Sequence, residues 1–303
     1  MLYINCNSDI KSVALSENGG FLQCINYFRQ NYVKSKGDVY CYQGNSDKEV
    51  SECLKDNVKN NKLLKLKDGP LEQLNNSKYL SNVIAIEKFI KDNKLSDINL
   101  ITANGVVEYK NNSHNEHQLY TIILGEIITA LSIQRDNGDF VLRIEDCFTN
   151  ITIKLLNILN DCYDDVFICK PLFSRSFNNE RYVICKKFKL KSTVKTNLIK
   201  KLKLLLDNMN KVKTNNKYVL DIISNFEVNQ KDQELIAGIN LHLVGEEHLN
   251  INKIIDYKNK KNYFGEQYHK FRDIQIDASV WWDSKFIKSK INDFNQTRKE
   301  LVT

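Results

Sequence analysis

Paired glycines after the first apolar run of the chain have the pattern of a cofactor-binding turn. Residues 16–21 read S-E-N-G-G-F and follow the run V-A-L, just before a helical pattern. Glycines at this place in an α/β sequence allow a tight turn and a close approach of the backbone to a nucleotide cofactor. Two glycines alone also fit an ordinary turn, and the preceding strand favours the cofactor interpretation. The residues predicted to border the cofactor are Glu17, Asn18, Gly19, Gly20 and Phe21.

A long basic run predicts an anionic partner. The 303 residues carry a formal net charge of +7, and from Lys186 to Lys217 the only acidic residue is Asp207. Such an excess of lysine attracts phosphates through long-range electrostatics. A solvated helix face explains the run equally well, so a nucleic-acid footprint and an ordinary exposed helix both remain open.

Other residues that are able to do chemistry have simpler explanations. His114 and His117 flank Glu116, but no third metal ligand is evident, so we predict a polar loop and no metal. Trp281 and Trp282 are able to stack on a base, and packing in a terminal helix is the ordinary role of such a pair. The eight cysteines include no C-x-x-C pair, which favours reduced, packed thiols in an intracellular protein.

Short apolar runs alternate with helical patterns between residues 11 and 190, as in parallel strands joined by helices. Strands are predicted at 12–15, 39–42, 98–101, 140–144, 166–169 and 182–185. Apolar residues recur at helical spacing within 119–131 and 155–159. The sequence therefore predicts an α/β fold of the Rossmann type, with a doubly wound, mostly parallel sheet.

The pattern changes after Leu190, where residues 194–209 form one apolar stripe of a basic helix and a helical pattern resumes from Tyr218. We therefore predict a domain at 1–190 and a basic helical extension at 191–303. Residues 56–81 are polar and contain D-G-P, which predicts a loop-rich connection. No stretch approaches the roughly twenty apolar residues of a membrane span, so no membrane partner is expected.

A more specific set of motifs lies between Leu95 and Leu190. It reads I-T-A-N-G, L-G-E-I-I-T-A-L, F-V-L-R-I-E-D-C-F-T and then K-P-L-F-S-R-S-F-N-N-E-R-Y-V-I-C. This order resembles the FtsJ-like RNA ribose 2′-O-methyltransferases, most closely the mRNA cap branch of eukaryotes and large DNA viruses. The resemblance covers residues 11–190 and implies a Rossmann-like, S-adenosylmethionine-dependent methyltransferase fold. The tail N-Y-F-G at 262–265 also resembles the large-virus members.

The resemblance implies a Lys-Asp-Lys-Glu tetrad, of which this chain keeps one member. Glu180 matches the glutamate, whereas Asn104 stands in place of the aspartate and Arg143 in place of the central lysine. No lysine occurs within residues 1–10, where the first is expected, and Lys11 is a poor substitute. Because an arginine keeps its proton near neutral pH, Arg143 cannot be the general base that accepts the ribose proton.

The remaining site residues are predicted to bind RNA or to form ion pairs within the site. Arg143 is able to contact a phosphate or to pair with Glu180, and Glu180 in turn is able to be an ordinary ion-pair partner. Lys170, Ser174 and Arg175 match the family loop that approaches RNA, although a lysine in a solvated loop is common. The full set predicted to contact RNA is Arg143, Lys170, Ser174, Arg175, Lys200, Lys201 and Lys203.

The sequence thus predicts a cap 2′-O-methyltransferase homologue with impaired catalysis that binds capped RNA or supports a partner subunit in capping or transcription. S-adenosylmethionine is expected to bind weakly, because the glycines of the turn are kept and its entrance is altered. An active methyltransferase with a changed tetrad and a scaffold that binds neither RNA nor cofactor are the alternatives. We expect the cytoplasm, and a viral factory or virion if the source is viral.

Overall fold

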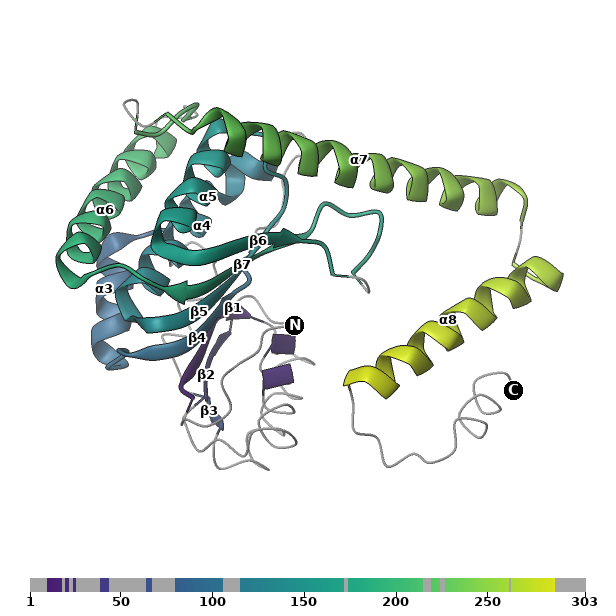
Figure 1. Cartoon of the computed structure of the whole chain (residues 1–303), viewed down its shortest axis with the longest axis horizontal. Helices are drawn as coiled ribbons and strands as arrows, with labels where there is room; N and C mark the ends of the chain where they lie inside the picture. The colour runs from purple at the N-terminus through teal and green to yellow at the C-terminus, as the bar shows by residue number, and fades with distance from the viewer. Residues whose placement is uncertain are drawn as a thin grey trace. The chain divides into compact units, whose positions relative to one another are not determined.

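The structure is a computed structural model in which a seven-stranded sheet carries helices on its face (Figure 1). It describes residues 10–17, 20–21, 24–25, 39–43, 64–66, 80–105, 115–171, 174–214, 219–223, 227–261 and 263–286. The strands are β1 (Ser12–Glu17), β2 (Val39–Gln43), β3 (Leu64–Leu66), β4 (Ile98–Ala103), β5 (Gln134–Ile144), β6 (Tyr163–Cys169) and β7 (Arg181–Phe188). The helices are α3 (Val83–Asp92), α4 (Asn115–Ile133), α5 (Asn150–Cys162), α6 (Ser192–Thr214), α7 (Gln230–Asn259) and α8 (Gly265–Phe286).

The strand order across the sheet is β3-β2-β1-β4-β5-β7-β6. Neighbouring strands from β3 to β5 run parallel, and β7 runs antiparallel to both β5 and β6. The order reverses beside β1, so β1 and β4 flank the switch point at which open α/β sheets bind ligands. The predicted Rossmann-like, mostly parallel sheet is confirmed, as are all six predicted strands.

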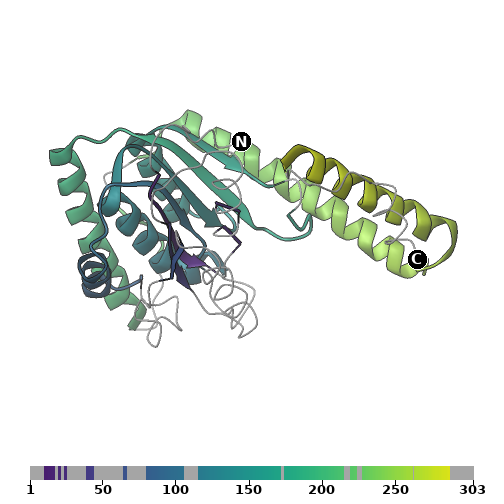
Figure 2. The same cartoon turned by 90° about the horizontal axis from the view of Figure 1, so that it is seen from below.

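Helix α4 is the centre of the helical layer. Its residues from Leu119 to Leu131 are all buried, because the sheet covers one side and α3, α5 and α6 pack around the rest. Figures 1 and 2 show α3, α4 and α5 on one face of the sheet, with α6 outside them. A helix that is apolar all round is typical of such a buried position.

Two elements inside the N-terminal half were not predicted. The three-residue strand β3 lies within residues 56–81, inside the stretch for which a loop-rich connection was predicted. Three residues, L-K-L, are too short to show a strand period, and their parallel pairing with β2 defines the strand. The helix α3 follows, and it begins where the Asn82 side chain accepts a hydrogen bond from Ala85 N at 3.2 Å.

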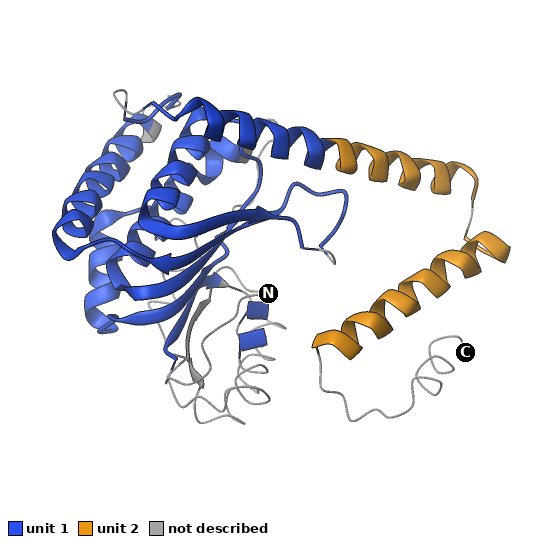
Figure 3. Cartoon of the chain, in the orientation of Figure 1, with its two compact units in different colours: residues 1–244 blue, residues 245–303 orange. Residues whose placement is uncertain are grey.

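The chain divides into two compact units, residues 1–244 and 245–303 (Figure 3). This division falls later than the predicted one at residue 190. The reason is that α6 packs on α4, and Leu202, Leu206 and Met209 join the core of the first unit. Within the described residues of the second unit, Ile276 is the only buried apolar side chain. No helix of the described residues is long and apolar enough to cross a membrane.

Candidate cofactor and catalytic site

The residues implied by the tetrad meet at one edge of the sheet. Parallel strands β4 and β5 end there, at Asn104 and just beyond Arg143. Strand β7 runs the other way, so it begins at the edge where β5 ends, and Arg143 pairs in register with Tyr182. This antiparallel pairing brings Glu180, which precedes β7, beside Arg143.

Arg143 is held between two carboxylates. Its Nη2 lies 3.4 Å from Glu145 Oε1, and its Nε lies 3.9 Å from Glu180 Oε1. The Arg143 side chain is 13% exposed, so water screens these pairs only partly. Its Nη1 is buried without a hydrogen-bond partner among the described residues. The predicted pairing with Glu180 is therefore present, and the Nη1 nitrogen of the guanidinium is left to donate to a ligand.

Glu180 is also fixed by neutral partners. The Tyr182 hydroxyl donates to Glu180 Oε1, and Asn178 Nδ2 donates to Oε2 at 3.2 Å. Burial and this hydrogen bond raise the pKa of Tyr182 above its usual value, so its hydroxyl stays a donor. The Tyr182 ring also meets the Phe21 ring edge to face, with centroids 5.9 Å apart. Tyr182 thus connects the tetrad glutamate with the predicted cofactor turn.

The cofactor turn is described in part. Gly20 is exposed and Phe21 half-buried, whereas Asn18, Gly19 and the Glu17 side chain lie outside the described residues. Strand β1 bulges between Ala14 and Glu17, and Ser16 has a φ of 54°, an uncommon value for a residue with a side chain. The backbone therefore leaves the regular strand at the point where the sequence predicted the turn.

A buried acid that the sequence analysis missed lies under the end of β4. Asn104 N donates to Leu15 O at 3.1 Å, and the next amide, Gly105 N, donates to Glu126 Oε1 at 2.8 Å. Glu126 comes from the middle of α4 and is 0% exposed. Desolvation by burial raises the pKa of Glu126 to about 8, although hydrogen bonds from Gly105 and Ser16 and the charge of Arg143 lower it. The one signal in the sequence is an acid inside the apolar run L-G-E-I-I.

These residues fit the methyl donor that the family uses. Arg143 Nη1 and Glu126 Oε2 are both buried and without a hydrogen-bond partner among the described residues. Glu145 Oε2, beside Arg143, is a third such atom among these residues. Buried polar atoms usually have a hydrogen-bond partner, so these unpaired atoms at one sheet edge favour a polar ligand there. Acids and exposed glycine backbone suit a nucleoside that carries a sulfonium charge.

In the loop before β7, Lys170 makes its hydrogen bonds within the loop. Lys170 Nζ donates to Asn178 O, to Asn178 Oδ1 at 3.1 Å and to Glu180 O at 3.3 Å. Ser174 Oγ donates to Pro171 O at 2.8 Å, while Arg175 is exposed. The structure therefore gives Lys170 and Ser174 supporting contacts in this loop and leaves the Arg175 side chain at the surface.

A second buried network holds the loop after β5. Arg181 is fully buried and donates to Asn240 Oδ1 at 2.5 Å and to Cys147 Sγ at 3.1 Å, with Asp146 Oδ1 at 3.6 Å from its Nη2. Asn240 belongs to α7 and also donates to Cys147 O at 2.8 Å. Glu116 accepts from Thr149 N at 3.1 Å on the other side of the loop. None of these contacts was predicted.

The basic helix lies away from this edge. Lys195 Nζ donates to Gln134 O at 2.8 Å, at the start of β5 and so at the opposite edge of the sheet. Lys203 pairs with Glu87 of α3 at 2.6 Å, and Lys200 and Lys201 are exposed. The structure does not bring these lysines together with the tetrad positions. Lys11 also lies at the opposite edge, because it precedes β1.

The other residues discussed from the sequence have packing contacts. His117 contacts the Tyr120 ring at 5.1 Å between centroids, and His114 lies outside the described residues. Within those residues no group of three or more His, Cys, Asp or Glu is placed to hold a metal. Trp281 and Trp282 both contact Phe286, with centroids 6.0 and 5.6 Å apart.

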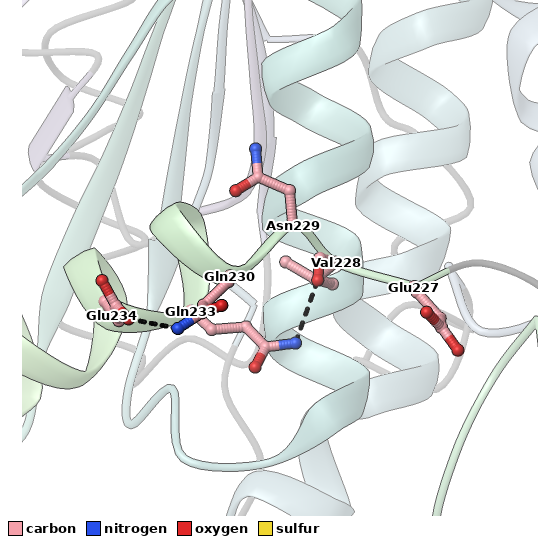
Figure 4. A pocket seen from close by; sticks show the side chains of 6 residues that line it. All are labelled: Glu227, Val228, Asn229, Gln230, Gln233 and Glu234. Atoms are coloured by element: carbon pink, nitrogen blue, oxygen red, sulfur yellow. Dashed lines mark hydrogen bonds between the residues drawn. The ribbon is translucent and has the colours of Figure 1, made fainter.

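A surface hollow of about 730 Å³ lies elsewhere, at the start of α7 (Figure 4). Its lining includes Glu227, Glu234 and Gln233, and Gln233 Nε2 donates to Val228 O at 3.0 Å. The Asn229 side chain caps the first turn of α7 by accepting from Lys231 N at 2.7 Å. The helix end is thus already satisfied, and none of the residues singled out from the sequence lines this hollow.

Comparisons with known proteins agree with the geometry. A model of the FtsJ-like methyltransferase family matches residues 15–188. Over 111 residues the chain is 31% identical to cap-specific mRNA (nucleoside-2′-O-)-methyltransferase 2 of Pongo abelii and 32% identical to methyltransferase 1 of Mus musculus. These matches cover 36% of this chain, and 14% and 13% of the two relatives. An rRNA methylase structure from Streptococcus thermophilus is 14% identical, with a TM-score of 0.36, and the match covers 61% of this chain and 91% of that one.

Proposed function

Because the chain belongs to the FtsJ-like methyltransferase family, we propose that it is a homologue of the mRNA cap 2′-O-methyltransferases that binds capped RNA and transfers methyl groups poorly. The relatives named above are cap-specific mRNA 2′-O-methyltransferases. The family match over residues 15–188 includes the motifs that meet at the sheet edge. Because the match is to a small part of those proteins, the substrate and the activity of the whole chain are part of the proposal.

One observation supports the proposal of impaired catalysis: Arg143 occupies the central tetrad position, between Glu145 and Glu180. Removing a ribose 2′-hydroxyl proton requires a group that is deprotonated some of the time near neutral pH. A guanidinium keeps its proton in this range, and here two carboxylates lie beside it. Arg143 is suited instead to hold a phosphate or the ribose through its buried, unused Nη1.

The chain's own residues have separable roles in this proposal. S-adenosylmethionine, when bound, supplies an electrophilic methyl group. Gly20 and Phe21 border it, and Tyr182 holds Phe21 and Glu180 in fixed relation. Arg143 and the exposed Arg175 bind RNA phosphates. Positioning without a base still accelerates transfer, so a trace of activity is consistent with the site.

Methyl transfer to capped RNA is expected to stay at trace level in the wild-type chain. Arg143→Lys combined with Asn104→Asp is expected to restore little, because these two changes supply no lysine at the first tetrad position and a tetrad acts as a unit. The measurement is transfer of a labelled methyl group, with Arg135→Lys at the other end of β5 as the matched control. Turnover on the order of 1 s⁻¹ in the wild-type chain would contradict the proposal and identify an active enzyme.

RNA affinity is expected to weaken when Lys200, Lys201 and Lys203 are replaced by glutamine. For each phosphate that the protein no longer neutralises, the slope of log affinity against log salt becomes shallower by about 0.7 for single strands. Titrations at several salt concentrations measure both effects. Replacing Lys253, Lys258 and Lys261 in the second unit removes the same charge and serves as the control. Unchanged affinity and slope in the first variant would favour a scaffold that does not bind RNA through α6.

A further inference from the structure

Glu126 is an acid in a place where acids are rarely buried. It lies in the middle of α4, is 0% exposed, and has apolar residues on both sides along the helix. Burying an ionisable group costs several kcal/mol unless the group is paired or stays neutral. Groups retained at such a cost are concentrated at functional sites. The tetrad does not include Glu126, so its placement needs its own explanation.

The surroundings of Glu126 connect it to the cofactor edge. Its Oε1 accepts from Gly105 N at 2.8 Å. A side chain at position 105 has little room, because its Cβ would lie 2.4 Å from Ile122 Cγ2 and 2.7 Å from that oxygen. The backbone turn at Asn104 and Gly105 is therefore in direct contact with this carboxyl group. The Ser16 side chain at the end of β1 also hydrogen-bonds to it. Its second oxygen is buried without a hydrogen-bond partner among the described residues.

We propose that Glu126 is a positioning residue that supplies, from beneath the turn at Asn104 and Gly105, the negative charge that Asn104 lacks toward a cationic methyl donor. The inference rests on the proposed function, because it assumes that S-adenosylmethionine binds over Gly20 and Asn104. Asn104 is neutral and stands where the resemblance implies an aspartate. Glu126 is the acid beneath it, held by the Gly105 amide.

The expected behaviour follows from the groups around this carboxyl. Ser16 of β1, Gly105 after β4 and Arg143 of β5 lower the pKa of Glu126. The described residues of α3, α5 and α6, which also pack on α4, contribute no group that shifts this pKa. With a pKa of about 8, Glu126 is mostly protonated at neutral pH in the free protein. A nearby sulfonium lowers that pKa, so binding releases a proton. Affinity for a cationic donor then rises with pH and levels off above about pH 8.

The test compares S-adenosylmethionine with S-adenosylhomocysteine, which lacks the sulfonium charge, by calorimetry from pH 6 to 9 in buffers of different ionisation enthalpy. Wild-type affinity for the cationic ligand is expected to rise about tenfold between pH 6.5 and 8, with proton release. Glu126→Gln keeps an oxygen for the Gly105 amide and removes the charge, so the part of the pH dependence that Glu126 causes should disappear. Any titration of the ligand's own amino group is common to both proteins. Glu87→Gln on α3 is the control and should behave as wild type.

The outcomes separate the inference from the proposed function. Binding of both nucleosides with the same pH profile in wild type and in Glu126→Gln would overturn the role of Glu126 and leave cofactor binding standing. Absence of binding by either nucleoside at every pH would overturn both. A loss of affinity in Glu126→Gln that is equal for the two ligands would show a merely structural role and also overturn the inference.

Discussion

Glu126→Gln is expected to stabilise the protein, by about 3 kcal/mol at pH 7 and up to ~5 kcal/mol above pH 8. Burial raises the pKa of Glu126 from 4.5 to about 8. The folded state therefore keeps a proton that the unfolded chain loses, and the stability of the wild type falls as the pH rises from 4.5 to about 8. At about 1.4 kcal/mol for each unit of pKa shift, the full difference is on the order of 5 kcal/mol. A glutamine has the same shape and does not titrate.

Urea unfolding at pH 5, 7 and 9 measures this effect as a gap between variant and wild type that widens with pH. Glu87→Gln provides the control, because Glu87 is 56% exposed in its pair with Lys203 and such pairs contribute about 1 kcal/mol or less. A gap that stays constant over this range, or a destabilised Glu126→Gln, would mean that the folded protein stabilises the ionised carboxylate. The buried position of Glu126 would then need a different account.

Arg181→Ala is expected to lower the free energy of unfolding by about 3–5 kcal/mol. Arg181 is fully buried, and its removal takes away the guanidinium that donates to Asn240 Oδ1 and Cys147 Sγ and the cation that pairs with Asp146. Asn240 Oδ1 then keeps the Cys147 thiol as a donor. Breaking one side of a buried pair costs this much because the remaining partners stay desolvated and unsatisfied. The loss of side-chain packing adds to the effect.

Chemical denaturation again gives the measurement, with Arg175→Ala as the control for removing an exposed arginine nearby. Arg181→Lys should lose part of the stability, because a single ammonium cannot reproduce the fork of a guanidinium. A double-mutant cycle with Asn240→Ala isolates the contact between β7 and α7, and we expect the two effects to be far from additive. A loss below about 1 kcal/mol in Arg181→Ala would indicate that the network contributes little.

Most of the α/β fold was predictable because six of the strands contain short apolar runs that alternate with helical patterns. The predicted runs F-V-L-R-I and Y-V-I-C lie within β5 and β7. The pairing of Arg143 with Glu180 was foreseen as one option, since the motifs placed both residues at strand ends. The resemblance to the FtsJ-like family identified these motifs as tetrad positions. Composition alone does not identify them.

The supporting contacts of the site were not predictable for a physical reason. Glu126 and Gly105 are 21 positions apart, and Cys147 and Asn240 are 93 apart. Hydrophobic periodicity reports which side of an element is buried and carries no information on which distant element covers it. Glu126 interrupts an otherwise apolar run, which was a visible sign, but its partner is a backbone amide. A backbone amide leaves no mark in a sequence.

The placement of the basic run shows a related limit. The stripe of apolar residues in α6 correctly indicated a helix that packs on one side. It did not show that the helix lies outside α3 and α4, with Lys195 at the edge opposite to Glu180. If α6 contacts RNA, it contacts a part of the molecule that is distant from the ribose at the tetrad positions.

The packing of α6 and of the first half of α7 determines how far the chain can be shortened. A fragment ending after β7, at Leu190, lacks Asn240 and would leave the guanidinium of Arg181 without its closest acceptor. It also lacks Leu202 and Leu206, so a strip of α4 would be open to water. A shortened chain that keeps these contacts therefore extends at least to Asn240, and we expect shorter fragments to expose apolar surface and to aggregate.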